Sequence, residues 1–206
     1  PSPVDKIRTL ELMKLADWLI VTGSQSNVRA AYSSGTPAIG VGAGNVTVIV
    51  DETADLDAAA FKIMKSKTFD HATSCSSENA LVLVDEIYNT FLDKLVDCGG
   101  RLLDEQEKQI LQDSLWVNGK LNRQMLARDA EILCQMTNLK RNDSTETKFL
   151  MVEESGIGPD YPFSGEKLSP VLSVYRASNF DDAQQIALNI LNHQGKGHSI
   201  GLHSSQ

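Results

Sequence analysis

The sequence predicts an α/β fold with a largely parallel sheet. Short apolar runs, which are typical of strands, alternate with longer segments in which apolar residues recur every three or four positions, as on one face of a helix. Most connections contain glycine, serine or proline, which mark turns. Alternation of this kind is the pattern of an α/β protein, and 206 residues are enough for one large domain or two small ones.

Helices are expected where the apolar spacing is helical. The segment 24–32 follows a Gly-Ser pair, 55–66 has the clearest apolar stripe, and 180–193 opens with two aspartates, which the helix dipole favours. A pair of glycines at 99–100 ends the segment before it. The expected helices are 4–16, 24–32, 55–66, 86–96, 104–112, 125–136 and 180–193.

Strands are expected where short runs of apolar and β-branched residues stand between turn residues. The run 18–22 precedes the Gly-Ser pair, 38–41 and 47–50 enclose a glycine-rich turn, and 80–84 follows a series of small polar residues. The expected strands are 18–22, 38–41, 47–50, 80–84, 149–152, 171–175 and 198–202.

Composition and charge argue against two classes of function. The net charge of −8 opposes binding to a phosphate backbone, so no nucleic-acid partner is expected. No apolar run approaches the roughly 20 residues that span a bilayer, and the first residues lack the pattern of a signal peptide, so no membrane association is expected. The hydrophobic fraction of 41% and the charged fraction of 22% are those of an ordinary globular protein.

The cysteines and histidines indicate a reducing compartment without a metal site. Cys75, Cys98 and Cys134 are too few for a disulfide framework, and their odd number leaves one unpaired. Cys98 and Cys134 stand in helical patterns and are expected to be structural. The four histidines lack the spacing of metal ligands, so we expect no metal. The sparse cysteines indicate a reducing compartment, so we expect a cytoplasmic location.

The segment 66–79 contains the first candidate for catalysis. It places Cys75 among small hydroxyl-bearing residues, between a helical segment and the strand at 80–84. Such neighbours leave room for a substrate and can donate hydrogen bonds to a thiolate, the reactive form of cysteine. The alternative is a partly buried structural cysteine, because free cysteine often packs as a small apolar residue. His71 stands nearby, but its place in the sequence gives little reason to assign it a catalytic role.

Three further segments could bind a ligand. The strand at 18–22 leads through Gly23 and Ser24 into a helix, and the free amide groups there can bind an anion, although Ser24 could simply cap the helix. The glycines within 40–45 allow a ligand, or another chain segment, to approach the backbone closely. Glu166 precedes a proline-stiffened strand, where the plain alternative is a surface glutamate before a turn.

Together these segments resemble the aldehyde dehydrogenase superfamily. In that family a Thr-Gly-Ser turn contacts the dinucleotide, and a glycine-rich turn leads into Ala-Asp-Leu-Asp. A Phe-x5-Cys segment presents the nucleophile, and the glutamate of a Glu-x-Phe-Gly-Pro-Val motif holds the nicotinamide ribose. The corresponding segments of this chain, in the same order and at similar spacing, are 22–24, 40–45 followed by 54–57, 69–75 and 166–171.

One departure from the family pattern narrows the resemblance. Hydrolytic members carry a glutamate at the start of the glycine-rich turn, which activates water; the matching residue here is Val41, which cannot deprotonate water. The chain is therefore similar to the CoA-acylating branch, and within it to the aldehyde half of bifunctional aldehyde–alcohol dehydrogenases and to acylating sulfoacetaldehyde dehydrogenases. In that branch a Gly-x-Gly-His segment also belongs to the active site, and it matches 195–198.

The resemblance implies two domains. Residues 47–206 would form an aldehyde dehydrogenase-like catalytic domain of three layers, αβα, and residues 1–46 would be the C-terminal remainder of a Rossmann-like NAD(P)-binding domain. Because the first strands of such a nucleotide domain would precede residue 1, we expect the chain to be a fragment of a longer protein.

The resemblance also implies residue roles and partners. Cys75 would be the nucleophile and His198 would handle protons, while Gly23, Ser24 and Glu166 would contact NAD or NADP. The implied reaction converts a small aldehyde, with CoA as co-substrate, to acyl-CoA, or runs in reverse, and the full-length protein would be a homo-oligomer. The alternatives are a hydrolytic aldehyde dehydrogenase and a catalytically inactive structural domain of the same fold.

Overall fold

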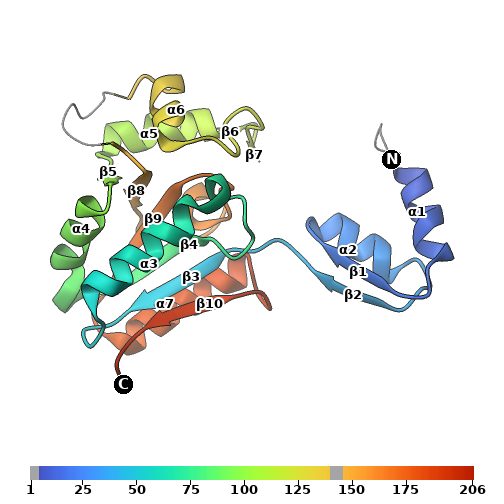
Figure 1. Cartoon of the computed structure of the whole chain (residues 1–206), viewed down its shortest axis with the longest axis horizontal. Helices are drawn as coiled ribbons and strands as arrows, with labels where there is room; N and C mark the ends of the chain where they lie inside the picture. Colours follow the sequence, from blue (N-terminus) through green and yellow to red (C-terminus); the bar gives the residue numbers. More distant parts are fainter. Residues whose placement is uncertain (1–4, 140–145) are drawn as a thin grey trace. The chain divides into compact units, whose positions relative to one another are not determined.

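The computed structural model describes residues 5–139 and 146–206, and it confirms the α/β class (Figure 1). The chain divides into two compact units, Pro1–Gly44 and Asn45–Gln206. This division falls close to the domain boundary expected between residues 46 and 47.

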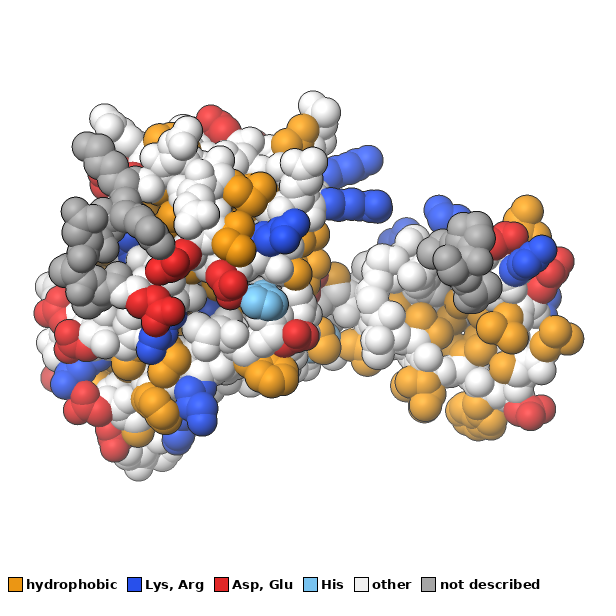
Figure 2. Space-filling view, turned by 45° about the horizontal axis from the view of Figure 1, so that its top comes forward, with side chains coloured by type: hydrophobic (Ala, Val, Ile, Leu, Met, Phe, Trp, Pro, Cys, Tyr) orange, Lys and Arg blue, Asp and Glu red, His pale blue; other side chains and the backbone are white. Residues whose placement is uncertain are grey.

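The first unit contains a pair of parallel strands with two helices. Its elements are α1 (Lys6–Leu15), β1 (Leu19–Thr22), α2 (Gln25–Tyr32) and β2 (Ala38–Val41). The register of the strands runs from Leu19 opposite Ala38 to Thr22 opposite Val41. The apolar stripe expected on the first helix is not buried in the described part of this unit, where Leu15 is 83% exposed. Hydrophobic side chains accordingly cover much of the smaller unit in Figure 2.

The second unit is built on a six-stranded sheet in which every pairing is parallel, with the order β10-β3-β4-β9-β8-β5. The strands are β3 (Val46–Val50), β4 (Glu78–Val84), β5 (Gly100–Leu102), β8 (Phe149–Glu153), β9 (Val171–Ala177) and β10 (Ile200–His203). The helices are α3 (Leu56–Thr68), α4 (Tyr88–Asp97), α5 (Glu105–Leu115), α6 (Ala130–Met136) and α7 (Phe180–His193).

The strand order explains the three layers. A connection between parallel strands is almost always right-handed, so its helix lies on one face when the chain moves along the sheet in one direction and on the other face when it moves back. The chain moves forward from β3 through α3 to β4, and back from β9 through α7 to β10. In Figure 1, α3 accordingly lies in front of the sheet and α7 behind it.

Burial along β8 shows the same division. Phe149 and Met151 belong to the main core, which includes apolar residues of α3, α4 and α7, while Leu150 and Val152 belong to a second core with Leu111 and Leu133 of α5 and α6. Alternate residues of a strand point to opposite faces, so at β8 Phe149 and Met151 lie on the face covered by α3 and α4, and Leu150 and Val152 lie on the face covered by α5 and α6.

The structure corrects three expectations about local elements. Of the helix expected at 125–136, only Ala130–Met136 is helical, and Ala127 before it has a left-handed φ of 53°. The strand expected at 198–202 is Ile200–His203, because the His198 amide closes a turn on the Gly195 carbonyl. A hairpin of β6 (Trp116–Val117) and β7 (Lys120–Leu121) was not expected, although its Asn-Gly turn is a typical hairpin signal.

Three short 3₁₀ helices complete the description of the second unit. They are η1 (Phe69–Ala72), η2 (Asp85–Ile87) and η3 (Pro162–Ser164). The first leads from α3 toward Cys75, and the third precedes Glu166.

Candidate active site

The candidate residues of the second unit lie in loops that enter four neighbouring strands. Asn45 precedes β3, Cys75 precedes β4, Glu166 precedes β9 and His198 precedes β10. These strands are adjacent in the order β10-β3-β4-β9 and all are parallel, so the four loops share the amino-terminal edge of the sheet. Segments that are far apart in the sequence therefore meet at one place.

The loop that carries Cys75 begins with an unusual turn. Asp70, His71 and Ala72 have φ values of 49°, 52° and 59°, in the left-handed region that costs energy for residues other than glycine. The Thr73 hydroxyl donates to the Asp70 carbonyl oxygen at 2.7 Å, and His71 Nδ1 lies 2.9 Å from Asp129 Oδ1, so both ends of the turn are held. Backbone strain of this kind is concentrated at functional sites.

Cys75 is the exposed cysteine of the three, since Cys98 is half-buried and Cys134 is buried. Burial raises the pKa of the Cys134 thiol, an effect that the Arg101 guanidinium partly opposes. The thiolate is the reactive form of cysteine, so Cys134 is poorly suited to be a nucleophile. The structure thus agrees with the structural interpretation of Cys134 and leaves Cys75 exposed to solvent.

The end of α3 contains a lysine that sequence reasoning missed. Lys67 has no exposed surface, and its Nζ donates to the carbonyl oxygen of Glu78 at 2.7 Å. Burial lowers the pKa of Lys67 to about 7, although Glu78 and Glu166 act in the opposite direction. The helical spacing from Ala60 through Ile63 could have indicated its burial, because Lys67 continues the same stripe.

Glu166 lies in a loop that is organised around a second buried lysine. Lys167 Nζ donates to the carbonyl oxygens of Phe163 (2.8 Å) and Gly165 (2.9 Å) and contacts Ser173 Oγ (3.2 Å). Glu166 itself is half-buried, and burial raises the pKa of its carboxyl group, with Lys167 and then Lys67 opposing the shift. A buried carboxyl group beside two lysines is an environment in which ionisation depends on the neighbouring charges.

Two asparagines connect these loops. Asn79, near the start of β4, accepts a hydrogen bond from the Lys167 amide (3.1 Å), which ties the Glu166 loop to the strand that follows Cys75. Asn45, buried before β3, donates from Nδ2 to the carbonyl oxygens of Ser164 (2.8 Å) and Gln194 (3.3 Å). The two asparagines lie in the segments 66–79 and 40–45 that the sequence singles out, but the sequence assigned neither of them a role.

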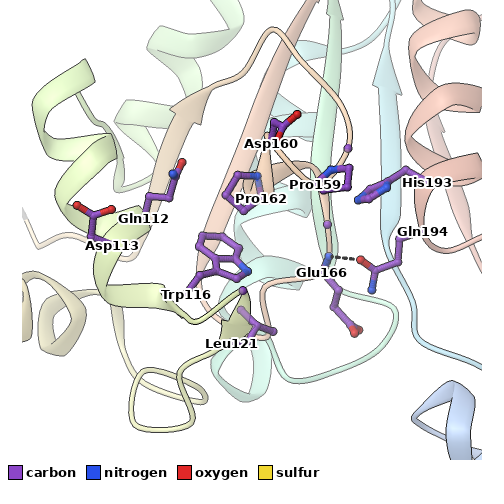
Figure 3. Close-up of a pocket in the computed structure, with 13 residues that line it drawn as sticks. Gln112, Asp113, Trp116, Leu121, Pro159, Asp160, Pro162, Glu166, His193 and Gln194 are labelled. Carbon is purple, nitrogen blue, oxygen red and sulfur yellow. Dashed lines mark hydrogen bonds between the residues drawn. The ribbon is translucent and has the colours of Figure 1, made fainter.

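The Gly195–His198 segment is joined to the same cluster. The Glu166 amide donates to Gln194 Oε1 at 3.2 Å, as Figure 3 shows, and Gly195 packs directly against Asn45. His198 is half-buried, and its Nδ1 is a buried atom without a hydrogen-bond partner in the described part of the chain. A buried imidazole nitrogen without a partner is uncommon, because buried polar atoms are usually hydrogen-bonded.

A cavity of about 500 Å³ adjoins this cluster on the side of Glu166 (Figure 3). It lies between the end of α5 and β6, the loop before η3, and the end of α7, with Trp116, Pro162 and His193 among its walls. Cys75 does not line it.

Gly23 and Ser24 belong to the first unit, at the start of α2. Ser24 Oγ accepts a hydrogen bond from the Asn27 amide (3.4 Å), so the capping interpretation is confirmed. Gly23 has a φ of 121°, and nothing lies within 4 Å of a Cβ placed on it. Val41 ends β2 opposite Thr22 and is 39% exposed.

The described residues contain neither a metal-binding cluster nor a membrane-spanning helix. Among residues 5–139 and 146–206, no group of three or more His, Cys, Asp or Glu side chains is placed to hold a metal ion. Within the same ranges, every helix is too short or too polar to cross a bilayer.

Comparison with known proteins identifies relatives over the whole chain. The sequence profile of the "Aldehyde dehydrogenase family" matches residues 14–109. "Sulfoacetaldehyde dehydrogenase (acylating)" of Cupriavidus necator is 51% identical over 100% of this chain and 42% of its own length. The curated relatives that the chain matches are therefore more than twice its length.

Solved structures of the same kind superpose closely. An acetylating aldehyde dehydrogenase from Geobacillus thermoglucosidasius is 38% identical, with a TM-score of 0.93 over 98% of this chain and 45% of that one. A propionaldehyde dehydrogenase from Rhodopseudomonas palustris, solved with bound CoA and an acylated cysteine, is 26% identical with a TM-score of 0.84, over 98% and 46% of the two chains. These matches confirm the expected fold, and the chain is similar to members of the aldehyde dehydrogenase family, acylating ones among them, over part of their length.

Proposed function

We propose that this chain is part of a CoA-acylating aldehyde dehydrogenase, which converts an aldehyde, CoA and NAD(P)+ to acyl-CoA and NAD(P)H. The observation that carries the proposal is the convergence of the Cys75, Glu166 and His198 loops at one edge of the parallel sheet. The names of the relatives from C. necator and G. thermoglucosidasius support the same reaction.

Cys75 is the proposed nucleophile. Its Sγ attacks the carbonyl carbon of the aldehyde and gives a thiohemiacetal, and loss of hydride from that carbon leaves a thioester on the cysteine. When bound, the oxidised nicotinamide supplies the hydride acceptor. The thiol of CoA then attacks the thioester carbonyl, and Cys75 leaves as the thiolate. The acylated cysteine of the R. palustris enzyme supports this role.

The proposed nucleotide-binding residues fit that group. The space around Gly23 leaves the start of α2 open to a ligand, and the amide groups of a helix N-terminus attract a phosphate. Glu166, as a carboxylate, can accept hydrogen bonds from ribose hydroxyl groups. His198 is the proposed group that handles the thiol proton, because an imidazole can both accept and donate a proton. Val41 cannot activate water, which favours transfer to CoA over hydrolysis.

A sulfonated two-carbon aldehyde is the first substrate to test. The C. necator relative is named for sulfoacetaldehyde. Ser74 and Ser76 beside Cys75 carry hydroxyl groups, which can donate to a sulfonate oxygen.

The test uses the full-length protein and measures aldehyde-dependent formation of NADH and of NADPH, with and without CoA. Sulfoacetaldehyde, acetaldehyde and propionaldehyde are compared, and Cys75→Ala is the control. Strict dependence on CoA, together with loss of activity in the variant, supports the proposal and reveals the nucleotide. Turnover without CoA would indicate the hydrolytic alternative, and no turnover with any aldehyde would indicate the structural one.

We also propose, from the same family resemblance, that the full-length protein is a homo-oligomer and is cytoplasmic. Light scattering coupled to gel filtration measures the first property, and fractionation of cells measures the second. A monomer, or recovery outside the cytoplasm, would contradict these proposals.

A further inference from the structure

Lys67 and Lys167 are two buried cations that the proposed reaction leaves without a role. Both side chains have no exposed surface. Complete burial of a lysine is uncommon, because removing its charge from water is costly unless the protein compensates. Such residues are retained where the charge is useful, which makes their surroundings informative.

The surroundings of the two lysines differ. Lys167 Nζ contacts three oxygen atoms of its own loop and of β9, so it organises that loop. Lys67 Nζ donates to the carbonyl oxygen of Glu78 and is within electrostatic reach of two carboxyl groups, those of Glu78 on β4 and Glu166 before β9. Lys167 faces Lys67 itself and the carboxyl groups of Glu154 and Glu166. Glu78 Oε2 is a buried atom without a hydrogen-bond partner in the described ranges.

Lys67 stands at the base of the Cys75 loop. Lys67 is the penultimate residue of α3, and the loop that follows α3 enters β4 at Glu78, whose carbonyl oxygen accepts a hydrogen bond from Lys67, so this hydrogen bond closes the loop. The side chain of the next residue, Asn79, accepts a hydrogen bond from the backbone amide of Lys167, the residue that follows Glu166. The Lys67 ammonium group therefore lies where the loop of the nucleophile meets the loop of Glu166.

We infer that Lys67 is a positioning residue of the proposed dehydrogenase: it closes the Cys75 loop and adds its positive charge to that of Lys167, and the two charges together keep the Glu166 carboxylate ionised for nucleotide binding. The inference rests on the proposed function. A half-buried carboxyl group favours its neutral form, which binds ribose hydroxyls less well than the carboxylate. A neighbouring cation opposes that preference, and it does so most at low pH, where Lys67 is protonated and Glu166 would otherwise become neutral.

The test is a double-mutant cycle on nucleotide affinity in the full-length protein. The fluorescence of NADH and NADPH measures the dissociation constant between pH about 5 and about 9 for the wild type, Lys67→Met, Glu166→Gln and the double variant. Lys65→Met, on the exposed side of the same helix, is the matched control. Melting curves show which variants are folded.

We expect Lys67→Met to weaken binding about tenfold, with the loss growing as the pH falls, and to have no further effect in the Glu166→Gln background. Lys67→Gln keeps a hydrogen-bond donor without the charge and is expected to behave as Lys67→Met does; if it binds as the wild type does, the charge is not the cause. If the losses of affinity in Lys67→Met and Glu166→Gln add up in the double variant, and their pH curves are parallel to that of the wild type, the inference is overturned and the proposed function still stands. A wild type that binds neither nucleotide would overturn the proposed function and the inference together.

Discussion

Replacing Gly195 by alanine perturbs the contact that joins the His198 loop to the Glu166 loop. Gly195 has a φ of +98°, and a Cβ placed on it would lie 2.8 Å from Asn45 Cβ and 2.9 Å from Asn45 N. These atoms belong to the residue whose side chain binds the carbonyl oxygens of Ser164 and Gln194. An alanine therefore has to displace Asn45 and, with it, the hydrogen bonds that position both loops.

Gly197 supplies the matched control. Its φ of +84° is also left-handed, but nothing lies within 4 Å of an added Cβ. For either glycine the backbone strain is about 1–2 kcal/mol, partly offset by a gain of about 0.4–1 kcal/mol from the less flexible unfolded chain. These contributions cancel in the comparison. What remains for Gly195→Ala is the overlap with Asn45, and forcing atoms into a packed site costs about 1–3 kcal/mol.

The measurement is the unfolding midpoint of the two variants in the full-length protein, together with nucleotide affinity. We expect Gly195→Ala to lower the free energy of unfolding by about 1–3 kcal/mol more than Gly197→Ala does, and to weaken nucleotide binding, because the Gln194–Glu166 hydrogen bond shifts. Equal midpoints and equal affinities would refute the reasoning, since they would mean that Asn45 moves aside without consequence.

Three other predictions concern single residues. Iodoacetamide is expected to label Cys75 before Cys98 and Cys134, because Cys75 is exposed and burial raises the pKa of the Cys134 thiol; peptide mass spectrometry gives the order, and equal slow labelling would favour a structural Cys75. Val41→Glu is expected to allow aldehyde oxidation without CoA, measured as NADH formation, and an unchanged need for CoA would contradict the comparison with hydrolytic relatives. The free energy of unfolding should rise from pH about 7 to about 10.5, with up to about 5 kcal/mol from Lys67, because unfolded Lys67 keeps a proton that folded Lys67 loses; denaturant titrations should show a smaller rise in Lys67→Met, where Lys167, whose pKa burial also lowers, still contributes.

The longer elements could be predicted from the sequence because their signals are local. The strand at 80–84 and the helix at 180–193 match β4 and α7 within two residues. The failures involve segments in which local preference is weak or is overruled. The apolar spacing at 125–136 resembles a helix, but the chain turns at Ala127, whose amide donates to the carbonyl oxygen of Leu168 in a distant loop. β5 has three residues, too few to show a period.

The candidate site was predictable where a residue type and its immediate neighbours carry the signal. Cys75 in a run of small polar residues and Glu166 before a stiffened strand are of this kind. Asn45, Gln194 and Lys67 are not, because each owes its importance to a partner elsewhere. Asn45 binds the carbonyl oxygen of Ser164, 119 positions further along the chain. In a sequence, a lysine at the end of an apolar stripe is more simply interpreted as a solvated end of the helix.

The sequence does not give the order of the strands in the sheet, and this order is what brings these residues together. The loops before β3, β4, β9 and β10 meet only because those strands are adjacent, and strands far apart in the sequence can be neighbours in many arrangements. Once the order is known, each loop at the shared edge contributes a different group: the thiol of the proposed nucleophile, a carboxyl group, an imidazole and an asparagine that holds two loops together. The buried lysines follow from the same arrangement, because a carboxyl group enclosed between packed loops needs a nearby cation to remain charged. The charge of Lys67 is thus a consequence of where the sheet places Glu166, which is why removing either residue should remove the effect of the other.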